Sequence, residues 1–158
     1  MRQTFSAETQ AGPPELLELM ADLRTYPHWL DVVSDVESTD DGEAWLVTLR
    51  ARVGPFSRSK RLRMVRTVHT RAGHDGGSVR FERREIDGKN HSDWILAAVV
   101  EAVTAEQPSD DRGAGRSRVE LDLVYDGTLW SGLLDGVLHA AADRATVKLQ
   151  DYVSAIHR

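Results

Sequence analysis

Residues 131–156 read SGLLDGVLHAAADRATVKLQDYVSAI, a stretch without proline in which apolar side chains recur at spacings of three and four. This spacing is typical of an amphipathic helix. At about 1.5 Å per residue, the helix would be roughly 39 Å long. A helix of that length needs an extended apolar surface to cover. Its apolar stripe consists of Leu134, Val137, Leu138, Ala141, Ala145, Leu149, Tyr152, Val153 and Ile156.

Most of the chain before this helix alternates between apolar and polar side chains, which indicates β-strands. Short turn signals such as Asp41-Gly42, Gly54-Pro55 and Asp87-Gly88 separate the runs. Runs joined by short turns pair antiparallel, because parallel pairing needs long crossovers. The predicted strands are residues 35–39, 43–53, 57–70, 78–86, 91–104 and 118–125, with a seventh at 3–8 that would join a sheet edge.

Two short helices are expected after the first strand. Pro13 and Pro14 suit the first turn of a helix, and leucines at helical spacing continue through Arg24. Pro27 would end that helix, and a second would carry residues 29–33. The sequence therefore predicts an α+β fold in which one curved antiparallel sheet grips one long helix, as a single domain over residues 1–158.

Composition narrows the function classes. A formal net charge of −5 argues against a general DNA- or RNA-binding protein, which needs a basic excess. The chain has no cysteine, so disulfides and thiolate metal sites are excluded. No histidine pair has metal-ligand spacing, so no metal and no cofactor is expected. No apolar run approaches the ~20 residues of a membrane span, and no signal segment is apparent, so we expect a cytoplasmic protein.

The order of these elements resembles the START-related helix-grip superfamily, also called SRPBCC, and its polyketide cyclase/dehydrase and coenzyme Q-binding-like branches. The resembling stretches are TFSAETQAGPPELLELMADL (4–23), YPHWLDVV (26–33), VGPFSRSKRLRM (53–64) and the C-terminal helix. The resemblance implies a helix-grip fold with a curved seven-stranded antiparallel sheet. It also implies a cavity between sheet and helix for a lipid, quinone or polyketide-like molecule. The superfamily has no universal catalytic residue, so none is carried over.

Candidate ligand-binding residues come from four parts of the chain. Arg83 and Glu85 share a face of the strand 78–86, and a charge directed into a concave sheet needs a partner or a ligand. An ion pair at an open rim is the competing explanation. In the long helix, a run of alanines flanked by larger side chains predicts either a void opposite the sheet or close packing. The candidates are Trp29, Phe81, Arg83, Glu85, Trp94, Leu134, Leu138, Ala141 and Ala145; for Trp29, packing is the favoured interpretation.

Two further features of the sequence have both a functional and a purely structural interpretation. Residues 50–71 hold eight lysines and arginines and no acidic residue. This run could bind an anionic surface, but pairing with the acidic residues 35–43 on an outer face is favoured. His69 and His91 lie near strand ends and could act as general bases if they faced a cavity. A structural or surface role is favoured for both.

Three functions remain open from the sequence. The leading one is binding of a hydrophobic small molecule in a cavity between the sheet and the C-terminal helix. The alternatives are a polyketide cyclase or dehydratase, for which the catalytic residues are unknown, and a protein- or ribosome-interaction module. A homodimer is compatible with each of them.

Overall fold

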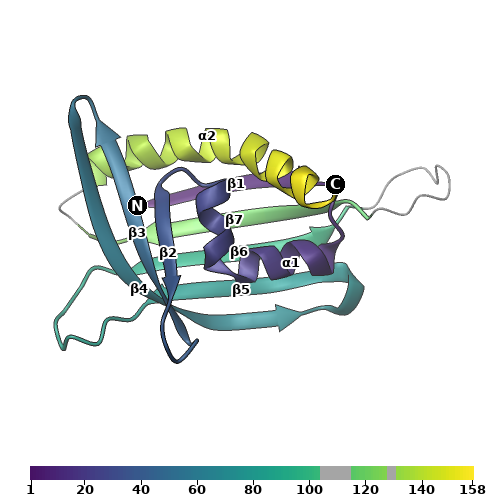
Figure 1. Cartoon of the computed structure of the whole chain (residues 1–158), viewed down its shortest axis with the longest axis horizontal. Helices are drawn as coiled ribbons and strands as arrows, with labels where there is room; N and C mark the ends of the chain where they lie inside the picture. Colours follow the sequence, from purple (N-terminus) through teal and green to yellow (C-terminus); the bar gives the residue numbers. More distant parts are fainter. Residues whose placement is uncertain (104–114, 128–130) are drawn as a thin grey trace.

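The computed structural model describes residues 1–103, 115–127 and 131–158, without the side chains of Val53 and of residues 131–134. Seven strands form one sheet (Figure 1). The strands are β1 (Arg2–Thr9), β2 (Val33–Ser38), β3 (Ala44–Val53), β4 (Phe56–Arg71), β5 (Gly76–Arg83), β6 (Trp94–Ala102) and β7 (Ser117–Tyr125).

The sheet has the order β1-β7-β6-β5-β4-β3-β2, and each neighbouring pair is antiparallel. Consecutive strands from β2 to β7 form a meander, and β1 adds to β7 at the edge. The curved seven-stranded antiparallel sheet predicted from the alternating runs and short turns is confirmed.

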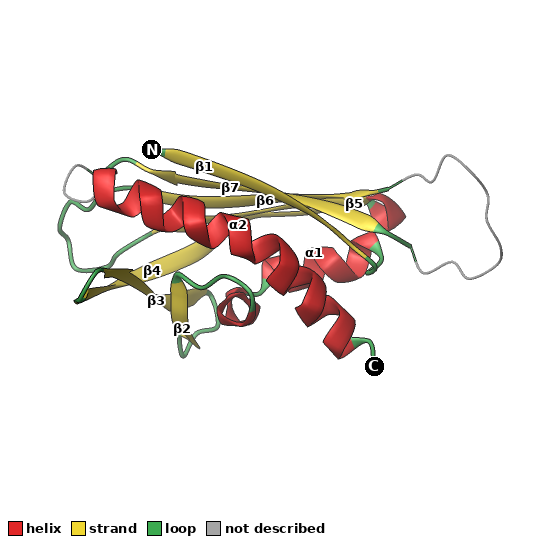
Figure 2. Ribbon diagram, turned by 90° about the horizontal axis from the view of Figure 1, so that it is seen from above, coloured by secondary structure: helices red, strands yellow, loops and turns green. Residues whose placement is uncertain are grey.

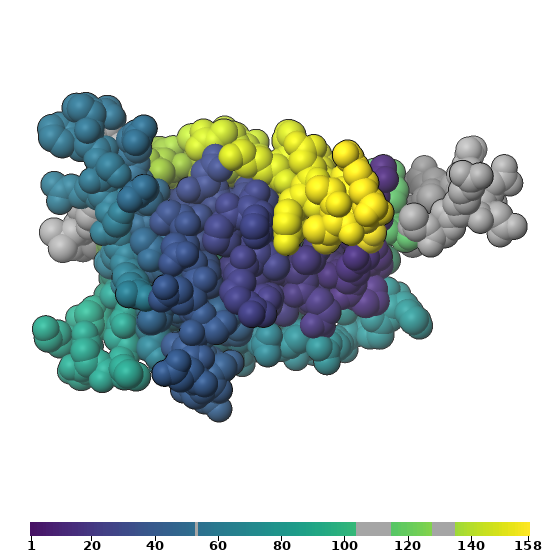
Figure 3. All heavy atoms as spheres, in the orientation of Figure 1, coloured from purple at the N-terminus to yellow at the C-terminus, as the bar shows by residue number. Residues whose placement is uncertain are grey.

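Two α-helices and a 3₁₀-helix lie on one face of the sheet (Figures 1 and 2). The α1 helix (Pro13–Ala21) packs on β5 and β6, whereas α2 (Ser131–Ile156) crosses the sheet in contact with β1 and β3. The 3₁₀-helix η1 (Leu23–His28) lies against β2, and a shorter one, η2 (Gly73–Asp75), precedes β5. In the space-filling view, α2 and the α1–η1 segment cover the middle and right of the near face, and residues of β2 to β4 form its left side (Figure 3).

The apolar stripe of α2 lies on the sheet as its spacing predicts. Leu138, Ala141, Ala145, Leu149 and Val153 are buried. The last member of the predicted stripe is different, because the Ile156 side chain is 46% exposed. The helix therefore covers the sheet over most of its length, and its final turn extends past the packed region.

The structure corrects the ends of several elements. The α1 helix ends at Ala21 rather than Arg24, because the Asp22 side chain accepts a hydrogen bond from the Arg24 backbone N–H and starts η1 there. The second short helix is η1, so residues 29–33 are not helical. The predicted strand 78–86 ends at Arg83, and a connection of residues 84–93 leads to β6.

The turn between β4 and β5 requires close backbone contact. Gly76 has a φ of 117°, and a Cβ added there would lie 2.0 Å from the Val100 carbonyl oxygen. A side chain is therefore excluded by β6 as well as by the backbone conformation. This close approach holds the start of β5 against β6, so that Val79 and Phe81 reach the core beneath α1.

Candidate functional site

An apolar pocket lies between the concave face of the sheet and α2, with a volume of about 70 Å³. On this measure a single water needs roughly 10–15 Å³. Two polar side chains in its lining bond elsewhere, Gln3 to Asp135 and Thr4 to Asp122. The pocket is lined by Gln3, Thr4, Phe5, Leu23, Tyr26, Leu30, Val32, Val33, Val36, Val47, Leu49, Leu62, Met64, Trp94, Leu96, Leu121, Leu123, Leu138 and Ala142.

The η1 segment contributes Leu23 and Tyr26 to the lining of this pocket. Tyr26 and Trp29 are fully buried and their rings lie 4.6 Å apart, with Phe5 of β1 6.0 Å from Trp29. The Tyr26 hydroxyl donates to the Met20 carbonyl oxygen at 3.0 Å, and burial raises the pKa of this phenol. This aromatic cluster packs beside the pocket, and Ala142 of α2 contributes only a methyl group to the lining.

A second, smaller pocket of about 20 Å³ adjoins the apolar pocket, and the two share Val32, Leu49 and Trp94. We call it the basic end pocket, because its lining includes the cationic residues Arg58 and Lys60 and no carboxylate. Its lining consists of Val32, Leu49, Ala51, Arg58, Ser59, Lys60, Trp94 and Tyr125.

Lys60 is the half-buried cation of this pocket. Its Nζ lies 6.0 Å from the centre of the Tyr125 ring, a distance at the limit of a cation–π contact. Burial lowers the pKa of Lys60, and the neighbouring Arg83 adds to the effect, while Glu85 opposes it. The ammonium therefore lies in a place that disfavours its charge.

Trp94 has a polar atom without a partner. Its ring packs on Tyr125 with centroids 4.5 Å apart, and the residue is 3% exposed. Among the described residues, no acceptor bonds its indole N–H. Buried donors are nearly always bonded in folded proteins, so an unpaired N–H in the wall shared by both pockets is an unusual feature.

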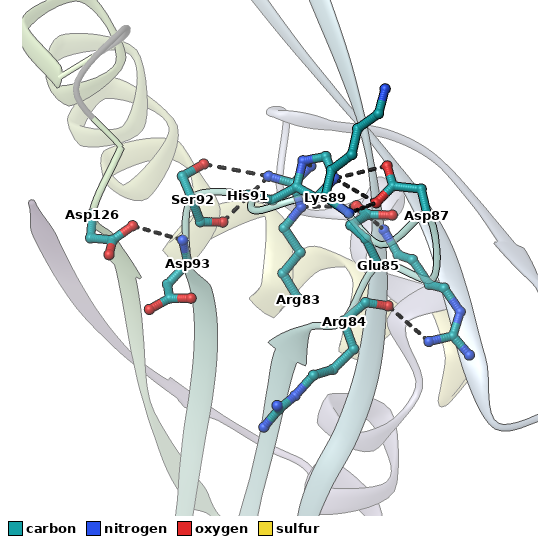
Figure 4. A network of polar contacts seen from close by, with 10 residues as sticks. Arg83, Arg84, Glu85, Asp87, Lys89, His91, Ser92, Asp93 and Asp126 are labelled. Carbon is teal, nitrogen blue, oxygen red and sulfur yellow. Dashed lines mark hydrogen bonds and ion pairs between the residues drawn. The ribbon is translucent and has the colours of Figure 1, made fainter.

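Arg83 and Glu85 form an ion pair at the end of β5, with Nε and Oε1 2.8 Å apart (Figure 4). The side chains are 6% and 19% exposed. Glu85 also accepts from the Arg63 backbone N–H at 3.2 Å, and Arg83 donates to the Ser92 carbonyl oxygen at 3.3 Å. The pair therefore fastens the 84–93 connection to the sheet and neutralises its own charge.

His91 extends this network, and its partners define its tautomer. Its Nδ1 lies 3.2 Å from Nη2 of Arg83, which can only donate, so Nδ1 must accept. The proton is then on Nε2, which donates to Asp87 at 2.8 Å. His91 thus bridges Arg83 and Asp87 in a surface network (Figure 4) and does not line the apolar pocket.

The predicted aromatic candidates lie in different environments. Trp94 lines both pockets. Trp29 and Phe81 are fully buried and contact neither pocket; Phe81 packs edge-on against Trp45, with ring centroids 5.5 Å apart. Their packing roles are the ordinary ones for large aromatic side chains.

The candidate residues on α2 also lie in different surroundings. Leu138 lines the apolar pocket, together with Ala142, which was not among the candidates. Ala141 instead lines an outer groove between α2 and the end of β3, and Ala145 is fully buried in packing. The side chain of Leu134 lies outside the described part of the structure.

Lys60 is the polar site residue that the sequence analysis missed, because it belongs to the basic run 50–71, which was assigned to an outer face. Part of that run does lie outside and is paired: Arg61 bonds Glu37 at 2.6 Å, and Arg71 bonds Glu18 at 2.8 Å. Lys60, however, is followed at every second position by Leu62 and Met64, which are both buried. Side chains two residues apart on a strand point to the same face, so this spacing was the signal that Lys60 lies on the inner face.

The described residues contain no group of histidines and carboxylates that could hold a metal ion. His69 lies on β4 with Nε2 3.5 Å from Glu18, outside both pockets. Burial lowers the pKa of His69, and the nearby Arg66 lowers it further. Within the described ranges, no helix is both long and apolar enough to span a membrane.

Comparison with known proteins supports the fold. No family model and no curated protein matches the sequence. A START superfamily protein from Mycobacterium smegmatis matches with a TM-score of 0.64 at 10% identity, over 98% of each chain. A conserved protein from Geobacillus kaustophilus gives 0.63 at 10% identity, over 98% of this chain and 96% of that one.

The Zhui aromatase/cyclase from Streptomyces sp. R1128 matches with a TM-score of 0.59 at 15% identity, over 100% of this chain and 96% of its own. The chain has the START-like helix-grip fold. At these identities the likeness establishes the START-like architecture alone. The START-like fold places α2 across the concave sheet, which is where the apolar pocket lies.

Proposed function

We propose that this protein binds a small hydrophobic molecule in the apolar pocket. The observation that supports this most directly is unfilled space in the middle of a packed core, because protein interiors are otherwise close-packed. Its lining comes from β1 to β4, β6, β7, η1 and α2, and thus from almost every element of the fold. A concave, mostly apolar site of this kind suits a small ligand.

The size of the pocket limits the ligand or requires some movement. A volume of about 70 Å³ suits a compact group such as an aromatic ring or a short branched chain. A longer lipid or quinone would need the side chains of α2 and β3 to move apart. The 20 Å³ basic end pocket provides the adjoining space for a polar end.

The test is a titration with a neutral apolar fluorophore, N-phenyl-1-naphthylamine, against the parent protein and the variant Ala142→Phe. The parent should bind the fluorophore, and the variant should lose at least about tenfold in affinity because its ring occupies the pocket. Its melting temperature should be unchanged or higher. Ala155→Phe is the matched control, since Ala155 is exposed on the same helix.

No binding to the parent, together with a lower melting temperature for Ala142→Phe, would contradict the proposal. In that case the space is too tight for a ring, and overpacking should cost about 1–3 kcal/mol.

Mass spectrometry of the protein isolated under native conditions from its own host would then identify the ligand. One structural neighbour is named an aromatase/cyclase, so each recovered molecule should be incubated with fresh protein. An unchanged mass supports binding, whereas turnover would make the pocket an active site.

A further inference from the structure

The basic end pocket shows which chemical group the ligand carries. Its polar lining includes the Lys60 cation and the Trp94 indole N–H, which is buried and unbonded among the described residues. The lining holds no carboxylate that could pair with the Lys60 ammonium, and its side-chain acceptors are the Ser59 and Tyr125 hydroxyls. An oxyanion on the ligand would accept from both Lys60 and Trp94.

The charged groups that act on the pKa of Lys60 are Arg83 and Glu85. Arg83 and Glu85 neutralise each other across 2.8 Å, so Glu85 is already engaged by an arginine and a backbone N–H. Lys60 then remains as an additional cation that has lost part of its hydration. A desolvated ammonium gains most from a negative partner, because an ion pair strengthens as water is removed from around it.

The two pockets are placed for an amphipathic molecule. Val32, Leu49 and Trp94 belong to both linings, so the apolar pocket and the basic end pocket adjoin. Trp94 therefore offers an apolar ring surface to the body of a ligand and a donor for its polar end. Lys60 approaches from β4, on the inner face that it shares with Leu62 and Met64.

We infer that the ligand is a hydrophobic oxyanion, such as a small aromatic or aliphatic carboxylic acid, whose negative group lies between the Lys60 ammonium and the Trp94 indole N–H. This inference rests on the proposed function and specifies the chemistry of the same site. The apolar body of the acid occupies the apolar pocket, and the oxygen atoms occupy the basic end pocket.

The experiment compares 2-naphthoate with 2-naphthamide, which have the same ring system and differ in charge. Binding is measured by calorimetry for the parent, Lys60→Met, Lys60→Arg and Trp94→Phe. The parent should prefer the acid by about tenfold or more, as expected for a charge-assisted hydrogen bond. Lys60→Met should remove the preference without weakening amide binding, and Lys60→Arg should keep part of it.

Two further variants separate a local effect from a general one. Lys89→Met removes a cation from the exposed 84–93 connection and should leave the preference unchanged. Trp94→Phe removes the N–H and should reduce acid binding more than amide binding.

The possible failures are distinguishable. Equal binding of the acid and the amide by the parent would overturn the oxyanion and leave the proposed function standing. Failure to bind either compound would overturn both. A preference that survives Lys60→Met would show that another group selects the acid, and the assignment to Lys60 would be wrong.

Discussion

Arg83 and Glu85 should stabilise the fold as a pair, so the free energies of unfolding lost in the two single variants should sum to more than the loss in the double variant. The changes are Arg83→Met, Glu85→Leu and the double variant. Breaking a fully buried pair costs about 3–5 kcal/mol, because one charge is left without a partner. Here the side chains are 6% and 19% exposed. We therefore expect about 3 kcal/mol for Arg83→Met.

The contacts that remain set the order of the two single variants. Without Glu85, the Arg83 guanidinium still donates to the Ser92 carbonyl oxygen and faces His91 Nδ1. Without Arg83, Glu85 retains the Arg63 backbone N–H as its bonded donor. Arg83, the charge left behind in Glu85→Leu, is the more buried of the two, but it keeps these acceptors, so we expect this variant to cost about 2 kcal/mol.

The assay is urea unfolding of the four proteins as a double-mutant cycle. The double variant should lose less than the sum of the single losses, with a coupling energy of about 1.5–3 kcal/mol. Additive losses would show that the residues do not act as a pair. Losses near zero in both single variants would place them in solvent-like surroundings and refute the reasoning from burial.

Two other changes test the backbone and the α2 contacts. Gly76→Ala should cost about 3 kcal/mol or more in thermal or urea unfolding, because its Cβ would lie 2.0 Å from the Val100 carbonyl oxygen. Gly136→Ala, in an open helical position, should instead stabilise by about 0.5–1 kcal/mol; equal effects would refute this contrast. Lys148 and Arg144 of α2 form ion pairs with Asp31 and lower the pKa of its carboxyl group. Their contribution is therefore present above about pH 4, the unfolded value, and is lost as pH falls through the lower folded value. Since Asp31 is one-third exposed, Asp31→Asn should cost only about 0.5–1 kcal/mol at pH 7, and a difference from the parent that persists at pH 2 would contradict this.

Local sequence patterns determined most of the fold. The alternation of Val119, Leu121 and Tyr125 in β7 and the turn at Asp41-Gly42 act over a few residues, so each strand could be located separately. The apolar stripe of α2 likewise predicted its bounds. Boundaries were less predictable at Ala21 and Arg83, because there a side-chain cap and an ion pair with the next connection end the element.

The site depended on information that no single segment contains. An outer face was favoured for Lys60 because its neighbours in sequence are basic. Its spacing of two and four residues from Leu62 and Met64, however, indicated the inner face. Whether Ala141 or Ala142 faces the pocket depends on the rotation of α2 about its axis. That rotation is a result of its packing on β1 and β3.

The sequence by itself thus determined which segments are strands or helices and that α2 must lie across a concave sheet, since periodicity and turn chemistry act locally. Only the tertiary structure decided where space remains and which donors meet at its end. Trp94 of β6, Lys60 of β4 and Tyr125 of β7 come together because the sheet curls. Such a meeting depends on the packing of all seven strands at once, and a pattern along one strand cannot encode it.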